Sequence, residues 1–165
     1  MPLYLAGQKI RGSEINSLPQ TYFVQSDQII NSNTNLIACV GLSFAAEANV
    51  RYFVECLLGY LSTAAADIKL GFAGPAGMTG WWTANGLNTG AAAGVGNLDA
   101  VVVENYVALH ARAGADPSPV LATPAAYMKL AAALGTVQLM FAQNSAVNFN
   151  TKILAGSVMR VTRLG

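Results

Sequence analysis

The stretch NVRYFVECLLGYLS, residues 49–62, sets the fold class of this chain. Apolar side chains recur at every second position from residue 50 onward, and the positions between them are mixed. One set is Val50, Tyr52, Val54 and Cys56, and the other is Arg51, Phe53 and Glu55. Successive side chains of a β-strand point to opposite faces of its sheet, so this period of two predicts a strand with one buried face.

Two further segments, IKLGFAG (68–74) and TVQLMFAQNS (136–145), alternate in the same way. The side chains expected to point inward are Ile68, Leu70 and Phe72 in the first segment, and Val137, Leu139 and Phe141 in the second. Residues 31–35 and 74–80 are rich in Asn, Ser, Gly and Pro, which are typical of turns. We therefore predict that residues 49–84 form consecutive antiparallel strands, with IKLGFAGPAG as a hairpin.

The remaining segments also favour strands over helices. We expect a long loop at 85–99, a strand within 100–113 and a Pro-rich link at 114–124. The segment AAYMKLAAALG (125–135) fits either an amphipathic helix or a strand, and its position among strands favours the strand. About eight to ten short strands result, which is typical of an all-β sandwich or barrel.

The final segment, TKILAGSVMRVTRLG (151–165), also reads as a strand. Its apolar residues are Val158, Met159, Val161 and Leu164, spaced by the polar or basic residues Arg160, Thr162 and Arg163, and no helix follows that could cover them. We therefore expect neighbouring strands, already in place, to hold this strand within a sheet.

The composition of the 165-residue chain indicates a single domain that associates with other subunits. Hydrophobic residues make up 53% of the chain and charged residues 10%, whereas ordinary domains carry about 25% charged residues. No uncharged apolar run reaches the about 20 residues that a spanning helix needs, and the N-terminus lacks the basic start of a signal peptide. Subunit contacts are therefore a better explanation than a membrane. The net charge is +1 and the basic residues are scattered, so we expect no nucleic-acid partner.

Residues suited to catalysis or metal binding are sparse. The single histidine, His110, and two cysteines, Cys39 and Cys56, cannot supply the four ligands of a Cys/His zinc site. We interpret the cysteines as buried free thiols rather than a disulfide. Nothing in the sequence pairs Glu55 with Asp67 across a cleft, as a glycosidase would require. We therefore predict no catalytic residues, no metal site and no cofactor.

Trp81 and Trp82 are adjacent, so in a strand one of them points into the core and the other outward. An outward tryptophan could stack on a sugar together with Tyr106 or Tyr127. This arrangement keeps a carbohydrate-binding module as an alternative to a purely structural protein.

Residues 1–19, MPLYLAGQKIRGSEINSLP, show no sustained period of 2 or 3.6. Short apolar clusters are separated by Gly, Ser, Asn and Gln, and the segment stops at Pro19. We interpret this segment as an extended arm whose apolar residues bind another molecule, and residues 20–165 as the β-sandwich domain.

Several segments, taken together, resemble the small all-β surface proteins of tailed bacteriophages. The hairpin IKLGFAGPAG and the ending QLMFAQNS…TKILAGSVMRVTRL carry most of the resemblance, which covers nearly the whole chain outside residues 85–125. The resemblance implies a jelly-roll sandwich of the tumour-necrosis-factor or head-fibre type that forms homotrimers. It also implies a non-enzymatic virion surface protein, made in the host cytoplasm and fastened to the particle by its arm.

The resemblance directs attention to three groups of residues. The expected anchoring residues of the arm are Leu3, Tyr4, Leu5, Ile10, Arg11, Ile15 and Leu18. The expected subunit interface contains Phe53, Met140, Val161 and Arg160. A receptor-binding loop, if the protein has one, would contain Trp82, Asn85, Asn88 and Asn97.

Two locations on a virion fit these expectations. A capsid decoration protein, which would bind the major capsid protein or another virion protein, is favoured because the arm is short and apolar and no stalk is present. The alternative is a collar or tail fibre, or an adhesin, that binds a host-surface glycan. A depolymerase is disfavoured because carboxylates suited to acid–base chemistry are sparse.

Overall fold

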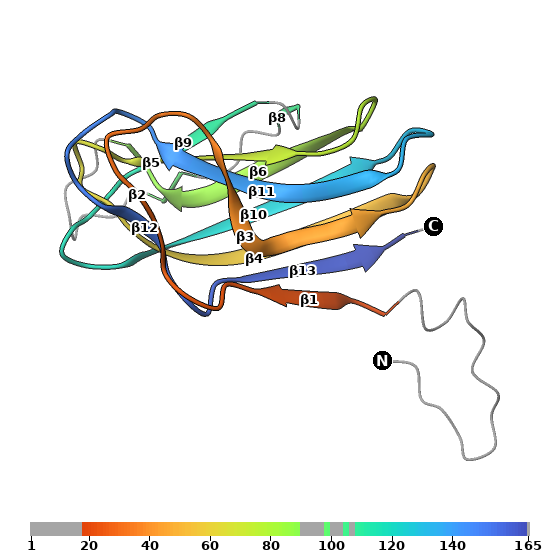
Figure 1. Cartoon of the computed structure of the whole chain (residues 1–165), viewed down its shortest axis with the longest axis horizontal. Coiled ribbons are helices and arrows are strands. Elements are labelled where there is room, and N and C mark those ends of the chain that lie inside the picture. Colours follow the sequence, from red (N-terminus) through yellow and green to blue (C-terminus); the bar gives the residue numbers. More distant parts are fainter. Residues whose placement is uncertain (1–17, 90–97, 100–103, 106–107, 165) are drawn as a thin grey trace, which may run out of the picture.

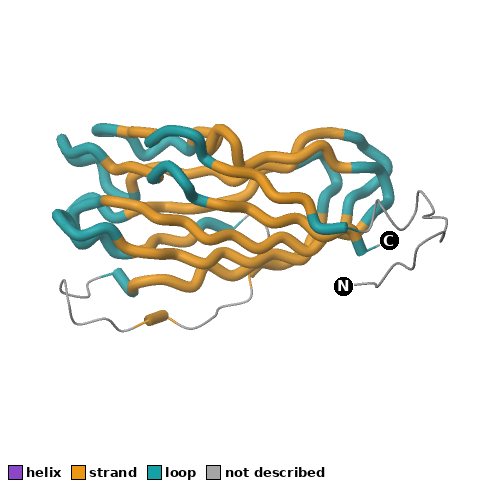
Figure 2. Tube along the Cα trace, turned by 90° about the horizontal axis from the view of Figure 1, so that it is seen from below, coloured by secondary structure: helices purple, strands orange, loops and turns teal. Residues whose placement is uncertain are grey.

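The computed structural model describes residues 18–89, 98–99, 104–105 and 108–164. Within these ranges the chain forms thirteen β-strands and no α-helix. The strands run along the long axis of the molecule in two layers, and the loops gather at the two ends (Figures 1 and 2). No helix in the described ranges is long and apolar enough to cross a membrane.

The strands are β1 (Gln20–Phe23), β2 (Gln28–Ile30), β3 (Ile37–Ala46), β4 (Arg51–Leu61), β5 (Ile68–Ala73), β6 (Thr79–Leu87), β7 (Leu98–Asp99), β8 (Glu104–Asn105), β9 (His110–Arg112), β10 (Val120–Lys129), β11 (Gly135–Gln143), β12 (Thr151–Ile153) and β13 (Val158–Arg163). The larger sheet has the order β1-β13-β4-β10-β6-β7, with β12 joined to β4, β2 joined to β12 and β8 joined to β6. The smaller sheet has the order β3-β11-β5-β9. All pairings are antiparallel.

This strand order is that of a jelly roll, which confirms the predicted fold class. Eight strands of a jelly roll, numbered along the chain, form sheets with the orders 1-8-3-6 and 2-7-4-5. Here β1 and β2 together form the first strand, and β12 and β13 together form the eighth. The other six are β3, β4, β5, β9, β10 and β11, in chain order. Strand β6 is an addition between the fourth and fifth strands, and it lies beside β10.

The final strand, β13, lies between β1 and β4, as the sequence led us to expect. The first and eighth strands are interrupted at the same level, where Val24 donates to the carbonyl of Ser157 and accepts from the amide of Gly156. The register of β1 on β13 continues that of β2 on β12. The shared interruption therefore bends both strands together without changing which side chains face the core.

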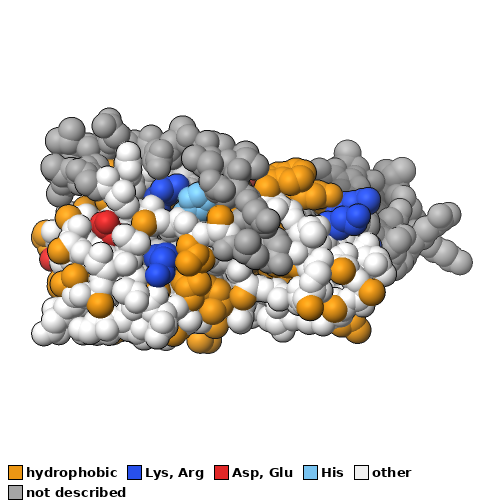
Figure 3. Space-filling view, turned by 90° about the horizontal axis from the view of Figure 1, so that it is seen from above, with side chains coloured by type: hydrophobic (Ala, Val, Ile, Leu, Met, Phe, Trp, Pro, Cys, Tyr) orange, Lys and Arg blue, Asp and Glu red, His pale blue; other side chains and the backbone are white. Residues whose placement is uncertain are grey.

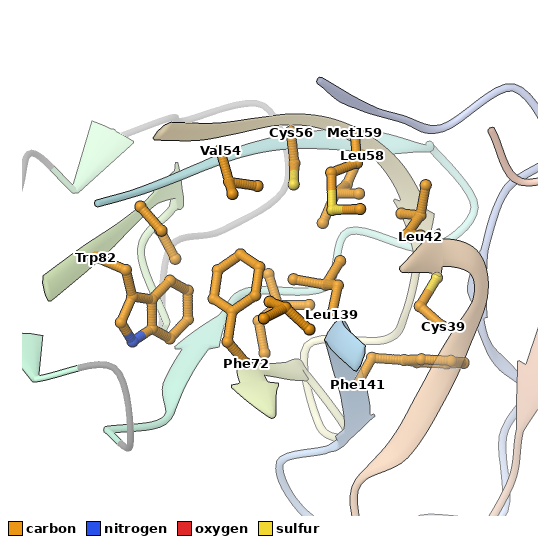
Figure 4. Packing of buried hydrophobic residues seen from close by; sticks show 14 of the residues in the cluster. Cys39, Leu42, Val54, Cys56, Leu58, Phe72, Trp82, Leu139, Phe141 and Met159 are labelled. Atoms are coloured by element: carbon orange, nitrogen blue, oxygen red, sulfur yellow. The ribbon is translucent and has the colours of Figure 1, made fainter. Parts of the chain in front are cut away.

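The core lies between the two sheets and is built from alternate residues of the long strands. Figure 4 shows Val54, Cys56 and Leu58 of the larger sheet facing Phe72, Leu139 and Phe141 of the smaller one. Trp82 is fully buried and meets the Phe72 ring edge-on, with ring centroids 5.3 Å apart. Each large apolar side chain removed from water in this way contributes about 1.5–3 kcal/mol to stability. The residues predicted to point inward on β4, β5 and β11 are all buried, so that prediction is confirmed.

The predicted hairpins within residues 49–84 are wrong, although the strands are present. β4 belongs to the larger sheet, β5 to the smaller and β6 to the larger again, so consecutive strands cross between the sheets. The turn residues at 74–78 are compatible with both a hairpin and a crossover. Pairing therefore depends on contacts between distant strands, such as β4 with β10.

The predicted Pro-rich link at 114–124 is only partly correct, because β10 begins at Val120. Pro124 is buried within this central strand. The hydrogen-bonded pairing of β10 with β4 is interrupted at Thr123 and Pro124. A proline has no N–H for the ladder, so the gap accommodates it. The strand interpretation of 125–135 is confirmed for Ala125–Lys129, and the chain then turns into β11.

The expected loop at 85–99 and strand at 100–113 also need correction. β6 continues to Leu87, and Leu98–Asp99 form a short strand against it. Only β8 and β9 are found in the second segment, and its other strand positions lie outside the described residues or in a loop. β-branched residues at 101–103 prompted the longer strand, but they are not among the described residues.

Gln143, fully buried at the end of β11, joins two loops at one end of the sandwich. Its Oε1 accepts hydrogen bonds from the amides of Asn33 (3.1 Å) and Val147 (3.3 Å). Its Nε2 donates to the carbonyls of Val147 (3.1 Å) and Phe149 (2.8 Å). A buried polar group that loses its partner costs about 1–3 kcal/mol, so this one side chain fixes the loop at 144–150.

Replacing Gln143 with Leu removes these hydrogen bonds and should lower the free energy of unfolding by about 2–4 kcal/mol. Urea unfolding measures the change. Gln138→Leu is the matched control, because Gln138 lies on the same strand but is half-buried on the side of the strand that points away from the core. This control variant should change the free energy of unfolding by no more than about 0.5 kcal/mol. Equal destabilisation by the two variants would contradict the role of Gln143.

Cys39 on β3 and Cys56 on β4 are buried free thiols, as predicted. Burial raises the pKa of Cys39 to about 12. Burial also raises the pKa of Cys56, with smaller contributions from Cys39 and Glu55. Because the thiolate is the reactive form, both thiols should be inert near neutral pH.

Native protein at pH 8 should therefore react slowly with a disulfide reagent, and both cysteines should react after unfolding in urea. The raised pKa also means that these thiols favour the folded state below their unfolded pKa near 9, and that this contribution is lost as the pH rises toward about 12. A variant with Cys39→Ala and Cys56→Ala should lose less stability over this range. Fast labelling of the native protein would contradict the burial of both thiols.

Candidate interaction surface

The face of the larger sheet that points away from the core, called here the outer face, is unusually apolar. Among the described residues, six large hydrophobic side chains on it are between 37% and 60% exposed. They are Phe23, Ile29, Phe53, Leu57, Trp81 and Leu121. Single exposed apolar residues are common on monomers, but a contiguous group of them marks an interaction site.

Three aromatic side chains form a row across the outer face. Phe53 on β4 is directly opposite Tyr127 on β10, and Tyr127 is opposite Trp81 on β6. The rings of Trp81 and Tyr127 stack, with centroids 4.7 Å apart and an angle of 24° between the ring planes. Directly opposite residues on one face of a sheet are within contact distance, so the row is an apolar strip three strands wide.

Charged side chains occupy defined positions beside the aromatic row. Arg160 on β13 is directly opposite Glu55 on β4, and both are exposed. On the other side of the row, Arg51 is opposite Lys129, so two like charges meet at that end of the face. The outer face therefore combines an apolar strip with one pair of opposite charges.

Charged groups are also few elsewhere on the surface. On the side of the molecule seen in Figure 3, hydrophobic and uncharged atoms predominate over Lys, Arg, Asp and Glu among the described residues. The low charge content of the sequence is thus expressed at the surface as well as in the core.

The four residues expected at the subunit interface do not share one surface. Phe53 and Arg160 lie on the outer face. Met140 is half-buried on the outer side of the smaller sheet. Val161 is only 4% exposed and belongs to the core, so its placement at an interface is wrong. In the strand β13 the core-facing residues are Met159 and Val161, which leaves Arg160 pointing outward.

The expected receptor loop is also revised. Trp82 is fully buried, and its Nε1 donates to the carbonyl of Ala108 at 3.2 Å, so it cannot form part of an exposed site. Asn85 is half-buried on β6, and Asn88 is exposed just after β6. Asn97 lies outside the described residues.

Of the residues expected in the anchoring arm, the structure describes only Leu18, which is 45% exposed. The others, from Leu3 to Ile15, lie outside the described residues. The arm therefore stays a prediction.

The described residues bring no catalytic arrangement together. Asp67 accepts a hydrogen bond from the amide of Gly114 at 3.0 Å, and burial raises the pKa of this carboxyl, partly offset by that bond. Glu55 is exposed in the middle of β4. The His110 ring meets Trp82 edge-on at 4.7 Å. Among the described residues no group of three or more His, Cys, Asp or Glu could hold a metal ion.

Trp81, Leu57 and Leu121 were not among the residues expected at the interface. A signal for two of them is present in the sequence. Leu57 continues the exposed series of Phe53 and Glu55, and Trp81 shares its face with polar Thr83. Leu121 gave no such signal, because it falls in the segment interpreted as a link.

Comparisons with protein families and with curated proteins find no match. Two solved structures align over 99% of this chain. The tripod (BppUct-A-L) from the baseplate of bacteriophage Tuc2009 is 11% identical, with a TM-score of 0.43 and 72% of that chain covered. The infectious bursal disease virus Gx strain structure is 10% identical, with a TM-score of 0.23 and 45% of that chain covered. At these scores, neither alignment assigns a function to this chain.

Proposed function

We propose that this chain is a non-enzymatic structural subunit on the surface of a tailed-phage virion, and that it forms a homotrimer through its outer face. The outer face carries the proposal, because it exposes large apolar side chains on a chain with only 10% charged residues. The sequence resemblance supplies the phage context and the trimer.

The composition of the outer face suits contact with further copies of the same chain. Aromatic residues and arginine are enriched at the centres of protein interfaces. Phe53, Tyr127 and Trp81 would supply the apolar centre. Arg160 and Glu55 would fix the register, because each can pair with the opposite charge of a neighbouring copy. A charge buried without such a partner would be costly.

The ends of the sandwich suit a protein anchored at one end. Gln20, where β1 begins, pairs with Val161 near the end of β13, and Leu164 bonds to Arg51 at the same end (Figure 1). An arm formed by residues 1–19 would therefore leave from this end. The loops at 62–67 and 144–150 would point away from the particle. A capsid decoration protein is preferred, and a collar or tail fibre or an adhesin is the alternative.

Sedimentation velocity tests the assembly. The wild-type protein should sediment with about three times the 17.2 kDa mass of one chain. The double variant Phe53→Lys and Leu57→Lys adds charge to the outer face and should shift the protein to monomers. Leu134→Lys is the matched control, because Leu134 is 74% exposed in a turn away from this face, and it should leave the mass unchanged. A wild-type monomer, or a double variant that still forms trimers, would contradict the proposal.

Immunogold electron microscopy of phage particles, with antibody against the β domain, tests the location. Gold distributed over the heads is the expected result and indicates a decoration protein. Gold confined to the collar or tail supports the alternative, and particles without any label would refute a virion role.

A further inference from the structure

The end of the sandwich opposite Gln20 carries a surface hollow that borders the outer face. It is lined by Asn31, Leu61, Asn148, Phe149, Asn150 and Lys152. On β4, Leu61 is eight residues beyond Phe53, which corresponds to about 26 Å along a strand. The hollow is therefore well separated from the aromatic row.

The register of the larger sheet brings the lining residues of the hollow together. Lys152 on β12 is opposite Ile29 on β2 and also opposite Leu61 on β4. Asn31 directly follows β2 and Asn150 directly precedes β12, so the pairing of these two strands brings both residues to the same end of the sheet. The Nδ2 of Asn31 donates to the Oδ1 of Asn150 at 3.0 Å, which joins the two chain segments across the hollow.

Buried hydrogen bonds hold the wall of the hollow in place. Gln143 binds the carbonyl of Phe149, as described above. The hydroxyl groups of Thr151 and Ser62, both fully buried, are 2.8 Å apart and hydrogen-bonded. The backbone of segment 148–150 is thus held near both of its ends before any ligand binds.

The lining offers amide groups for hydrogen bonding. Within the described part of the chain, neither the side-chain amide of Asn148 nor the side-chain Nδ2 of Asn150 makes a hydrogen bond to the protein. An asparagine amide both donates and accepts, which matches the hydroxyl groups of a sugar. Phe149 and Leu61 add apolar surface for the C–H face of a pyranose ring.

The charge of the lining narrows the ligand class. Among the described residues, Lys152 is the single charged residue of the lining, and no carboxylate contributes to it. A cation with two or more amides favours an acidic sugar over a basic one. We infer that this hollow binds a saccharide that carries a carboxylate, with Lys152 facing the carboxylate and Asn148 and Asn150 facing hydroxyl groups.

The test is a glycan array probed with the full chain and displaying neutral, uronic-acid and sialylated oligosaccharides, followed by calorimetry on the glycan retained best. The wild-type protein should retain acidic glycans. Asn148→Ala should weaken binding at least tenfold, and Lys152→Gln should reduce the preference for acidic over neutral glycans. Asn144→Ala is the matched control, because Asn144 is exposed in the same loop but does not line the hollow. It should bind within twofold of wild type.

Several results would overturn this inference. They are retention of no glycan by the wild type, retention of neutral glycans alone, and equal binding by the Asn148→Ala and Asn144→Ala variants. Loss of binding in Trp81→Ala with full binding in Asn148→Ala would move the site to the aromatic row. Urea unfolding shows that each variant is folded, and sedimentation of the same samples reports assembly separately.

Discussion

The pairing of β4 on both of its edges is the constraint on which the rest of the structure depends. β4 is joined to β13 and β12 on one side and to β10 on the other. Its register is therefore fixed twice, and a shift by one residue would exchange its two faces. Val54 and Leu58 are held in the core, and Phe53 and Leu57 are held on the outer face.

The same pairing explains how a chain with so few charges can be organised for association. The jelly roll buries one apolar set between its sheets, and a second apolar set is left on the outer face. Because β13 and β10 flank β4, they extend this second set into a surface several strands wide. Assembly and ligand recognition would then occupy different levels of one sheet, with the aromatic row at the end near Gln20 and the asparagine-lined hollow at the opposite end.

The core faces of the long strands are predictable from the sequence because alternation is a local property, as Val54 and Phe72 show. The pairing partners are not predictable in the same way, since turn residues do not specify the sheet that the next strand joins. Adjacent tryptophans in a strand must point to opposite faces, but this rule does not say which of the two is buried. On β6 the buried positions are every second residue from Trp82 onward, which places Trp82 in the core and Trp81 on the outer face. The asparagine-lined hollow combines residues 31, 61, 148–150 and 152, and only the register of distant strands brings these together.

Self-association of the outer face is tested most directly by hydroxyl-radical footprinting with mass spectrometry, which measures side-chain accessibility in solution. Leu134 and Val40, which are 74% and 73% exposed, serve as internal references. In the assembled protein, oxidation of Phe53, Tyr127 and Trp81 should be suppressed well below the rates of freely exposed aromatic side chains. Oxidation of Trp81 and Phe53 at the rates expected for their 52% and 37% exposure in a single chain would contradict burial of this face between subunits.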